Sequence, residues 1–265
     1  MKIIDSHTHI YPDKIAVKAS NSISDFYSVG VKFDGTVGKL LERLSNAGIS
    51  ECVVHSVATT PAQVDSINRF IAKSVSEHPD VFFGFATLHP DSDDIKRDVD
   101  NAIAMGLHGI KLHPDFQKFN ADSDEAMRIY EAVGGRLPIL IHAGDYRTEF
   151  SKPERILNVC RTFPKQDIIA AHFGGWSVWG ECAKELADCG IYVDTSSTQG
   201  FIPPERVREL LDIFSGDRIL FGSDYPMWDA ADEIKMLNKV LREEEKEKVF
   251  HENFENLMKK YKTKI

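Results

Sequence analysis

The feature that most constrains this 265-residue chain is a regular alternation of two kinds of segment. Short apolar or β-branched runs recur eight times, each followed by a longer stretch with apolar residues three or four positions apart. Such runs are typical of strands buried on both faces, and the longer stretches have the period of amphipathic helices. The predicted strands are 2–7, 51–57, 81–88, 108–113, 138–142, 167–172, 191–196 and 218–224.

Eight strand–helix repeats favour an α/β fold that closes into a (β/α)8, or TIM, barrel. Such barrels commonly run to about 250 residues as one domain. Since no linker-like or low-complexity stretch interrupts the pattern, we predict a single domain over residues 1–265. The alternative is an open doubly wound sheet, but no glycine-rich phosphate loop follows the first strand.

Several predicted strands end in a histidine or another polar residue. Active sites of such barrels lie at the C-terminal ends of the strands, and polar groups ending apolar strands need a reason. The residues concerned are His7, His9, Lys111, His113, His142, His172 and Asp224. We expect them to gather at one end of the barrel.

Four of these residues predict a metal centre. His7 and His9 are two positions apart, so on a strand they share a face and can reach one ion. His142 adds a third imidazole and Asp224 a carboxylate. This donor set suits zinc or another first-row divalent ion, with a position left for water or substrate.

Other polar residues have structural interpretations. His55 lies inside the second strand and is predicted to be a hydrogen-bonded core residue, and Asp194 to close the seventh strand. Asp5 is a candidate partner that orients a ligand histidine. His113 shares a face with Lys111, but the proline after it can turn it away, so we place it beside the site.

The substrate is indicated only by residues that follow strand ends. Aromatic side chains with one arginine, Arg147, suit a small, partly apolar, anionic compound, although these residues could simply pack loops together. The long loop 10–35 is predicted to line or cover the site. The aromatic candidates are Tyr11, Phe26, Tyr27, Tyr146, Trp176, Trp179, Phe201, Tyr225 and Trp228.

Charge and hydropathy exclude several classes of partner. The formal net charge of −9 disfavours nucleic acid, and no stretch has the apolar length of a membrane span or the pattern of a signal peptide. The four cysteines form no CxxC pair and are expected to be reduced thiols. We therefore expect a cytoplasmic protein that binds a small-molecule substrate, and we leave a homo-oligomer open.

Seven motifs span nearly the whole chain and resemble those of the amidohydrolase superfamily. The resemblance is closest to the amidohydrolase-related barrels that include lactone hydrolases and metal-dependent decarboxylases. The motifs are DSHTHIYP (5–12), HGIKLHP (108–114), LPILIHAGD (137–145), IIAAHFGG (168–175), IYVDTSS (191–197), ILFGSDYP (219–226) and HENFENL (251–257). As a set they are specific for fold and metal, and much less so for substrate.

The resemblance implies roles for individual residues. His7, His9, His142 and Asp224 would bind the ion, and Asp224 would also take a proton from the metal-bound water. His172 would bind a second metal or act as an acid–base group and electrostatic stabiliser.

Lys111 has several interpretations. In binuclear members a lysine on the fourth strand is carbamylated and bridges two metals, and KLHP here resembles the KLYP stretch of dihydroorotases. Mononuclear members lack this bridge, and a lysine at the barrel mouth could instead bind a substrate carboxylate or pair with Asp224. We favour one ion, with two if Lys111 is carbamylated.

The leading hypothesis is a metal-dependent hydrolase that uses a metal-activated water on a small, carboxylate-bearing lactone, amide or ester. Asp224, His172 and Lys111 are the candidate catalytic residues. The alternative is a metal-dependent decarboxylase of a small aromatic or unsaturated acid. A third hypothesis is a non-catalytic scaffold that binds metal.

Overall fold

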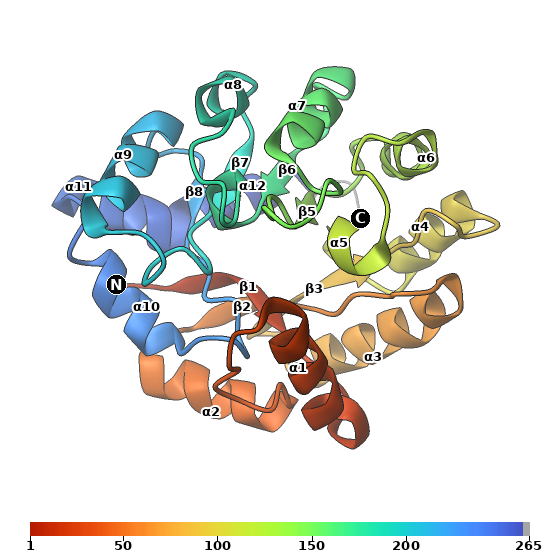
Figure 1. Cartoon of the computed structure of the whole chain (residues 1–265). Helices are drawn as coiled ribbons and strands as arrows, with labels where there is room; N and C mark the ends of the chain where they lie inside the picture. The colour runs from red at the N-terminus through yellow and green to blue at the C-terminus, as the bar shows by residue number, and fades with distance from the viewer. Residues whose placement is uncertain (262–265) are drawn as a thin grey trace.

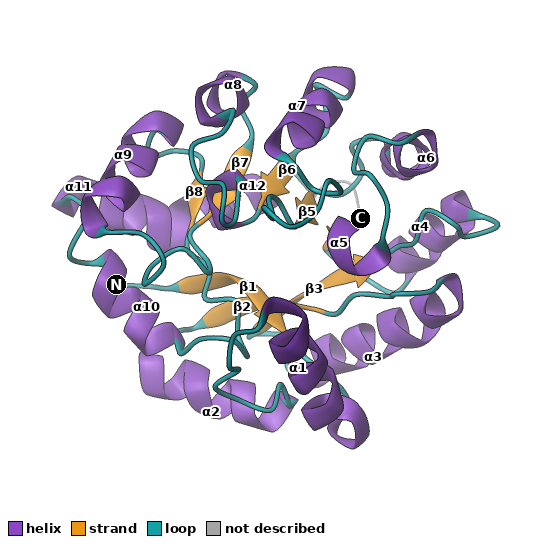
Figure 2. Cartoon of the chain, viewed as in Figure 1, coloured by secondary structure: helices purple, strands orange, loops and turns teal. Residues whose placement is uncertain are grey.

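The computed structural model describes residues 1–261 and contains the predicted barrel. Eight parallel strands form one sheet in sequence order, with helices around the outside (Figures 1 and 2). The strands are β1 (Ile4–His9), β2 (Glu51–His55), β3 (Phe82–Thr87), β4 (Gly109–Leu112), β5 (Ile139–Ile141), β6 (Ile168–Ala170), β7 (Tyr192–Asp194) and β8 (Ile219–Leu220). The predicted domain limit, residue 265, lies outside the described residues.

Hydrogen bonds between the first strand and the segment that begins with β8 close the ring. The amide of Ser6 donates to the carbonyl of Phe221 (2.8 Å), and the amide of Asp224 donates to the carbonyl of His7 (2.9 Å). The amide of His9 donates to the carbonyl of Tyr225 (2.7 Å). The sheet is therefore a barrel rather than the open alternative.

The helices lie between successive strands and pack their apolar faces on the barrel. They are α1 (Asp13–Tyr27), α2 (Val37–Ala47), α3 (Val64–Glu77), α4 (Ile95–Ala104), α5 (Pro114–Gln117), α6 (Asp124–Val133), α7 (Pro153–Thr162), α8 (Ala183–Asp188), α9 (Pro204–Phe214), α10 (Ala230–Leu237), α11 (Glu243–Glu247) and α12 (Asn253–Lys259). Short turns of 3₁₀ helix are η1 (Pro61–Gln63) and η2 (His172–Gly174), and η3 (Lys248–Glu252) is a π-helical turn.

The segment 10–35 was predicted as a loop, and that prediction is wrong because most of it is helix α1. The buried face of α1 consists of Ala16, Ser20 and Ile23. Two of these residues are small or polar, so the segment lacks the strong apolar stripe that marks an amphipathic helix in sequence. In Figure 1 this helix stands beside the mouth of the barrel, where a loop was expected.

The N-terminal end of the barrel interior is filled by an apolar layer. One side chain from most strands contributes to it, and α12 covers it from below with Phe254, Leu257 and Met258. The strand residues of this layer are Ile4, Val53, Phe85, Leu140, Ile169, Tyr192 and Leu220.

Two expectations about the chain as a whole can be compared with residues 1–261. No helix in this part is both long and apolar enough to cross a membrane. The four cysteines are free thiols, of which Cys52 and Cys160 are buried and Cys182 and Cys189 are half-buried.

Candidate metal centre

The two-residue period of the strands places polar groups directly above the apolar layer. Because alternate side chains point to the same side of a strand, the residue two positions after an apolar-layer residue also faces the barrel interior. At the ends of β2, β5 and β7 these residues are His55, His142 and Asp194. The same period puts Lys111 of β4 on the inside, two positions after Gly109.

An irregularity in β1 changes the face of the strand to which its later side chains point. Ile4 belongs to the apolar layer, yet His7 and His9 also face inward, although His7 is an odd number of positions, three, after Ile4. The register between β1 and β2 shifts between Asp5 and Thr8, as at a β-bulge, which changes which face the later residues point to.

Asp5 supports this bulge. Its Oδ1 accepts hydrogen bonds from the backbone amides of His7 (3.1 Å) and Ser223 (3.0 Å). The expected contact with a ligand histidine is therefore made to the backbone of His7 and not to its ring: Asp5 holds the backbone of β1 and the segment after β8. Burial of this carboxyl raises its pKa to about 6.

His7, His9 and Asp224 form the first donor group. The Nε2 atoms of the two histidines are 3.3 Å apart, and Oδ1 of Asp224 lies 3.4 Å from Nε2 of His7 and 3.3 Å from Nε2 of His9. Two ligand atoms that bind one ion at about 2.0–2.1 Å with tetrahedral angles lie about 3.3 Å apart. The three atoms therefore match one face of a zinc-type tetrahedron.

Asp194 fixes the tautomer of His7. Its Oδ2 accepts a hydrogen bond from Nδ1 of His7 (2.8 Å), so the lone pair of His7 is on Nε2, toward the other donors. Burial opposes ionisation of Asp194, but its electrostatic interaction and hydrogen bond with His7 outweigh burial and lower the carboxyl pKa. Asp194 thus does more than close β7, because it orients a predicted ligand.

His142 and His172 form a second donor group. Nε2 of His142 lies 2.9 Å from the carbonyl of Gly144, and Nδ1 of His172 lies 3.0 Å from the carbonyl of Ser196. A carbonyl accepts only, so each of these nitrogens must carry the proton of its neutral ring. The remaining nitrogens, Nδ1 of His142 and Nε2 of His172, then face each other with lone pairs at 3.1 Å.

Two facing lone pairs repel unless a cation lies between them. Burial, the largest effect, lowers the pKa of both His142 and His172 to about 3, so a shared proton is disfavoured at neutral pH. A metal ion is the cation that suits two neutral imidazoles. The structure thus pairs His142 with His172, beside the group His7–His9–Asp224.

Lys111 is fully buried in the same site. Its Nζ lies 3.2 Å from Nε2 of His7. Burial lowers the pKa of the amine to about 8, although the charges of Asp194 and Asp224 oppose this shift. A substantial share of Lys111 is therefore uncharged just above neutral pH.

Two candidate ligand residues adopt strained backbone conformations. His172 has φ 59° and Asp224 has φ 60°, a left-handed region that residues other than glycine rarely occupy and that often marks functional sites. Asp224 is also fixed through its side chain. The hydroxyl of Ser197 donates to its Oδ2 (2.5 Å), and the indole of Trp228 donates to that hydroxyl (2.8 Å).

A pocket with aromatic walls opens above these donors. Tyr27, which comes from α1, lies with its hydroxyl 2.9 Å from Nε2 of His113. The lining residues are His7, His9, Ile23, Tyr27, Val29, Lys111, His113, Phe116, His142, His172, Trp176, Ser197, Phe201, Asp224, Met227 and Trp228. This combination of apolar walls and a polar floor is typical of small-molecule sites.

The residues that line the pocket differ from some of those predicted to contact the substrate. Arg147 forms an ion pair with Asp145 (2.6 Å), and its guanidinium lies over the rings of Phe26 and Trp176, so it braces the rim of the site. The basic side chain that lines the pocket is Lys111 instead. Tyr146 is largely exposed to solvent.

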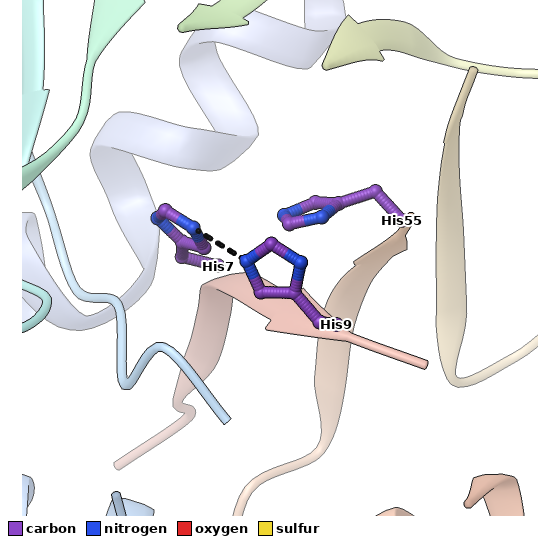
Figure 3. Close-up of side chains that lie close together, drawn as sticks. All are labelled: His7, His9 and His55. Atoms are coloured by element: carbon purple, nitrogen blue, oxygen red, sulfur yellow. Dashed lines mark hydrogen bonds between the residues drawn. The ribbon is translucent and has the colours of Figure 1, made fainter. Parts of the chain in front are cut away.

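Two histidines were misplaced by sequence reasoning. His113 was set beside the site, but it lines the pocket and stacks on His142, with ring centroids 4.0 Å apart. His55 is buried as predicted, but neither of its ring nitrogens has a hydrogen-bond partner within residues 1–261. It lies against His9 and His7 instead (Figure 3). The signal that could have found it is its place at the end of a strand, two positions after an apolar residue.

Comparison with known families decides the relationship. A family model described as amidohydrolase matches residues 4–257. The chain belongs to the amidohydrolase family. This membership confirms the predicted resemblance and shows an enzyme with metal-dependent, amidohydrolase-like catalysis. None of the curated proteins compared with the sequence matches it.

Solved structures share the fold at low sequence identity. An uncharacterised TIM-barrel protein of Bordetella bronchiseptica has TM-score 0.79 and 16% identity, with 98% of this chain and 99% of that one covered. A dihydroxybenzoic acid decarboxylase of a Polaromonas species, with bound manganese, has TM-score 0.74, 17% identity and 97% coverage of both chains. A probable 2-pyrone-4,6-dicarboxylic acid hydrolase of Acinetobacter baumannii has TM-score 0.71 and 15% identity, covering 98% and 100%.

Proposed function

We propose that this amidohydrolase-family enzyme hydrolyses a small, carboxylate-bearing lactone, amide or ester in a metal-dependent reaction. The observation that carries the proposal is the pair of donor groups, His7–His9–Asp224 and His142–His172, on the floor of one pocket. A divalent ion bound there lowers the pKa of water to about 7 and polarises a substrate carbonyl.

Asp224 is the proposed proton acceptor. Burial opposes its ionisation, but the neighbouring imidazoles lower its pKa, so the group is a carboxylate at neutral pH. Its Oδ2 is held by Ser197, which keeps the carboxylate directed at the pocket floor. A carboxylate fixed in this way can accept a proton from the attacking water and return it to the leaving group.

Two donor groups support two ions rather than the single ion favoured by sequence, and with them a carbamylated Lys111. In that modification the lone pair of Nζ attacks the carbon of CO₂, and one carbon–oxygen π bond opens to leave a carboxylate oxygen. The proton lost by the nitrogen passes to solvent. The reaction needs an uncharged amine, which the lowered pKa of Lys111 provides. Left unmodified, the same amine would bind the substrate carboxylate.

Zinc is the metal we propose. The imidazole-rich donors and the spacing of the first group suit a tetrahedral ion. Manganese is the main alternative, since a decarboxylase with the same fold carries it.

A second candidate reaction is decarboxylation of a small aromatic acid. It is favoured by the rings of Tyr27, Phe116, Trp176, Phe201 and Trp228 in the pocket lining, which suit a flat substrate. Decarboxylases of dihydroxybenzoate and 5-carboxyvanillate also share the fold. In this case the residues of the floor would hold the carboxylate and deliver a proton to carbon.

The test is a substrate screen on protein of known metal content. Small lactones, carboxylate-bearing amides and esters, and hydroxylated aromatic acids are assayed in parallel for acid release and for CO₂ release. We expect hydrolysis without CO₂, and its loss after chelation or in His142→Ala and Asp224→Asn. CO₂ release alone would favour the second candidate. If the wild-type protein contained no metal, and both substitutions left its metal content and every activity unchanged, the hypothesis of a metal-dependent enzyme would fail.

Elemental analysis of Lys111→Met tests the number of ions. A bridging carbamate predicts about two ions per wild-type chain and a loss of at least one in the variant. An unmodified lysine that binds substrate predicts unchanged metal content with a raised KM.

A further inference from the structure

We propose that His55 of β2 is an additional metal ligand, which extends the group His7–His9–Asp224 to a third strand. The inference rests on the proposed metal-dependent function. None of the motifs that mark the family in this chain includes His55, and its role is suggested by its surroundings alone.

The position of His55 follows from the pairing of the first two strands. His55 is the last residue of β2 and lies opposite His9 in the parallel register. Its ring centroid is 4.4 Å from that of His9 and 5.1 Å from that of His7. One ring nitrogen from each of the three histidines lies within 4.8 Å of the others. In Figure 3 the ring of His55 reaches from β2 toward the other two.

The hydrogen bonding of His55 is incomplete. A neutral imidazole has one N–H donor and one acceptor nitrogen, yet both nitrogens are buried and find no partner in the described part of the chain. A buried polar group without a partner destabilises the folded state. By contrast, the ring of His108 accepts a hydrogen bond from the amide of Gly84. An ion bound to one nitrogen of His55 would supply a missing partner.

Packing alone is the competing explanation for His55. The rings of His9 and His55 meet edge to face at 85°, which two aromatic groups can adopt without an ion. An apolar residue would serve that purpose without orphaned nitrogens. A histidine is needed only if its nitrogen binds something, and the nearest groups able to share an ion with it are His9 and His7.

The experiment compares metal binding by wild-type protein, His55→Gln and His89→Gln. His89 is a matched control: it is buried and has one orphaned ring nitrogen, but it follows β3 and its other nitrogen accepts the amide of Asp91. Each metal-free protein is titrated with Co²⁺, whose visible absorption reports ligand number and type. Zn²⁺ affinity is then measured by competition with a chelator.

For His55→Gln we expect Zn²⁺ affinity at least tenfold weaker and an altered Co²⁺ spectrum, while His89→Gln matches the wild type. Equal affinity and an identical spectrum for His55→Gln would overturn the proposal. If wild-type protein binds metal and His55→Gln binds it equally, only this inference fails. If wild-type protein binds none, the proposed function fails with it.

A second variant separates ligation from folding. His55→Leu removes both orphaned nitrogens at similar size, so its metal-free form is expected to unfold at the wild-type temperature or above. If His55 is a ligand, the increase in melting temperature on adding Zn²⁺ will be smaller than in the wild type. An undiminished increase would again overturn the proposal.

Discussion

At the scale of single residues, the site depends on which ring nitrogens carry protons. Asp194 holds the proton of His7 on Nδ1, and the carbonyls of Gly144 and Ser196 hold those of His142 and His172. In each ring the other nitrogen is left with a lone pair that faces a second donor. Groups that touch no ion themselves therefore define the donor set.

Replacement of Asp194 tests whether this carboxylate sets the position of the proton on His7. Asp194→Asn keeps the size of the side chain but removes the charge that favours a proton on Nδ1 of His7. We expect metal affinity to fall about 10–100-fold, the usual effect of losing such a supporting carboxylate. Competition with a chelator measures it. The control, Asp217→Asn, removes an exposed ion pair with Lys248 and should leave affinity unchanged.

Gly144 is a residue whose backbone cannot accept a side chain. It has φ 82°, and a Cβ would lie 2.5 Å from backbone atoms of Gly175 and Trp176. Gly144→Ala is expected to lower the free energy of unfolding by more than about 3 kcal/mol, or to shift the loop that supports His142. Urea unfolding measures the loss.

Gly48→Ala is the matched control for this prediction. Gly48 also has a positive φ, 69°, but a Cβ there meets nothing within 4 Å. Only the backbone penalty of about 1 kcal/mol applies. Equal losses in the two variants would show that crowding at Gly144 is unimportant.

At the scale of elements, the strands set the layers of the interior, and the segments after them complete the site. The bulge in β1 turns His7 and His9 inward, and α1 brings Tyr27 over the pocket.

Helix α10 affects the pH dependence of stability, because it buries a carboxyl group. Glu233 is 2% exposed and accepts a hydrogen bond from Gln199 (3.2 Å).

Glu233 predicts a pH dependence of stability. Burial raises its pKa from 4.5 to about 8, so between these values the folded protein binds more protons than the unfolded chain. The free energy of unfolding therefore falls as pH rises through this window. Glu233→Gln removes the effect and should stabilise the protein by about 4 kcal/mol at pH 8, but by less than about 1 kcal/mol at pH 5.

Urea unfolding at the two pH values measures this difference. The control is Glu243→Gln on α11, at a residue that is exposed and pairs with Lys246. It should alter stability little at either pH. A stabilisation of Glu233→Gln that is equal at pH 5 and pH 8 would contradict the assignment to its ionisation.

At the scale of the whole molecule, the candidate metal donors link the first strand of the barrel to the segment that follows the last strand. His7 and His9 lie on the first strand, and Asp224 follows the last, where the ring is closed by a few hydrogen bonds. An ion shared by these residues binds only the folded chain, because unfolding separates its ligands. Metal binding is therefore expected to stabilise the whole barrel.

Removal of metal tests this linkage. With free ion at a hundred times its dissociation constant, binding adds about 2.7 kcal/mol. In a chain of this size that corresponds to roughly 5–10 °C in melting temperature, measured by calorimetry with and without chelator. Asp224→Asn should show a much smaller difference. Identical melting temperatures for metal-loaded and metal-free wild-type protein would contradict the prediction.

The sequence by itself determined the architecture and the main donors. Strand and helix periods are local properties, so eight repeats could be counted, and strand-end residues such as His7, His142 and Asp224 could be assigned to one end of a barrel. Helix α1 was missed because its buried face is partly small and polar.

Only the tertiary structure decided how those donors are grouped. The pairing of His142 with His172 depends on the carbonyl that each ring meets, those of Gly144 and Ser196. The neighbours of His55 depend on the register between β1 and β2. These contacts join residues far apart in the chain, and a difference of one residue in register would turn a side chain to the opposite face. The local sequence pattern does not determine which register forms.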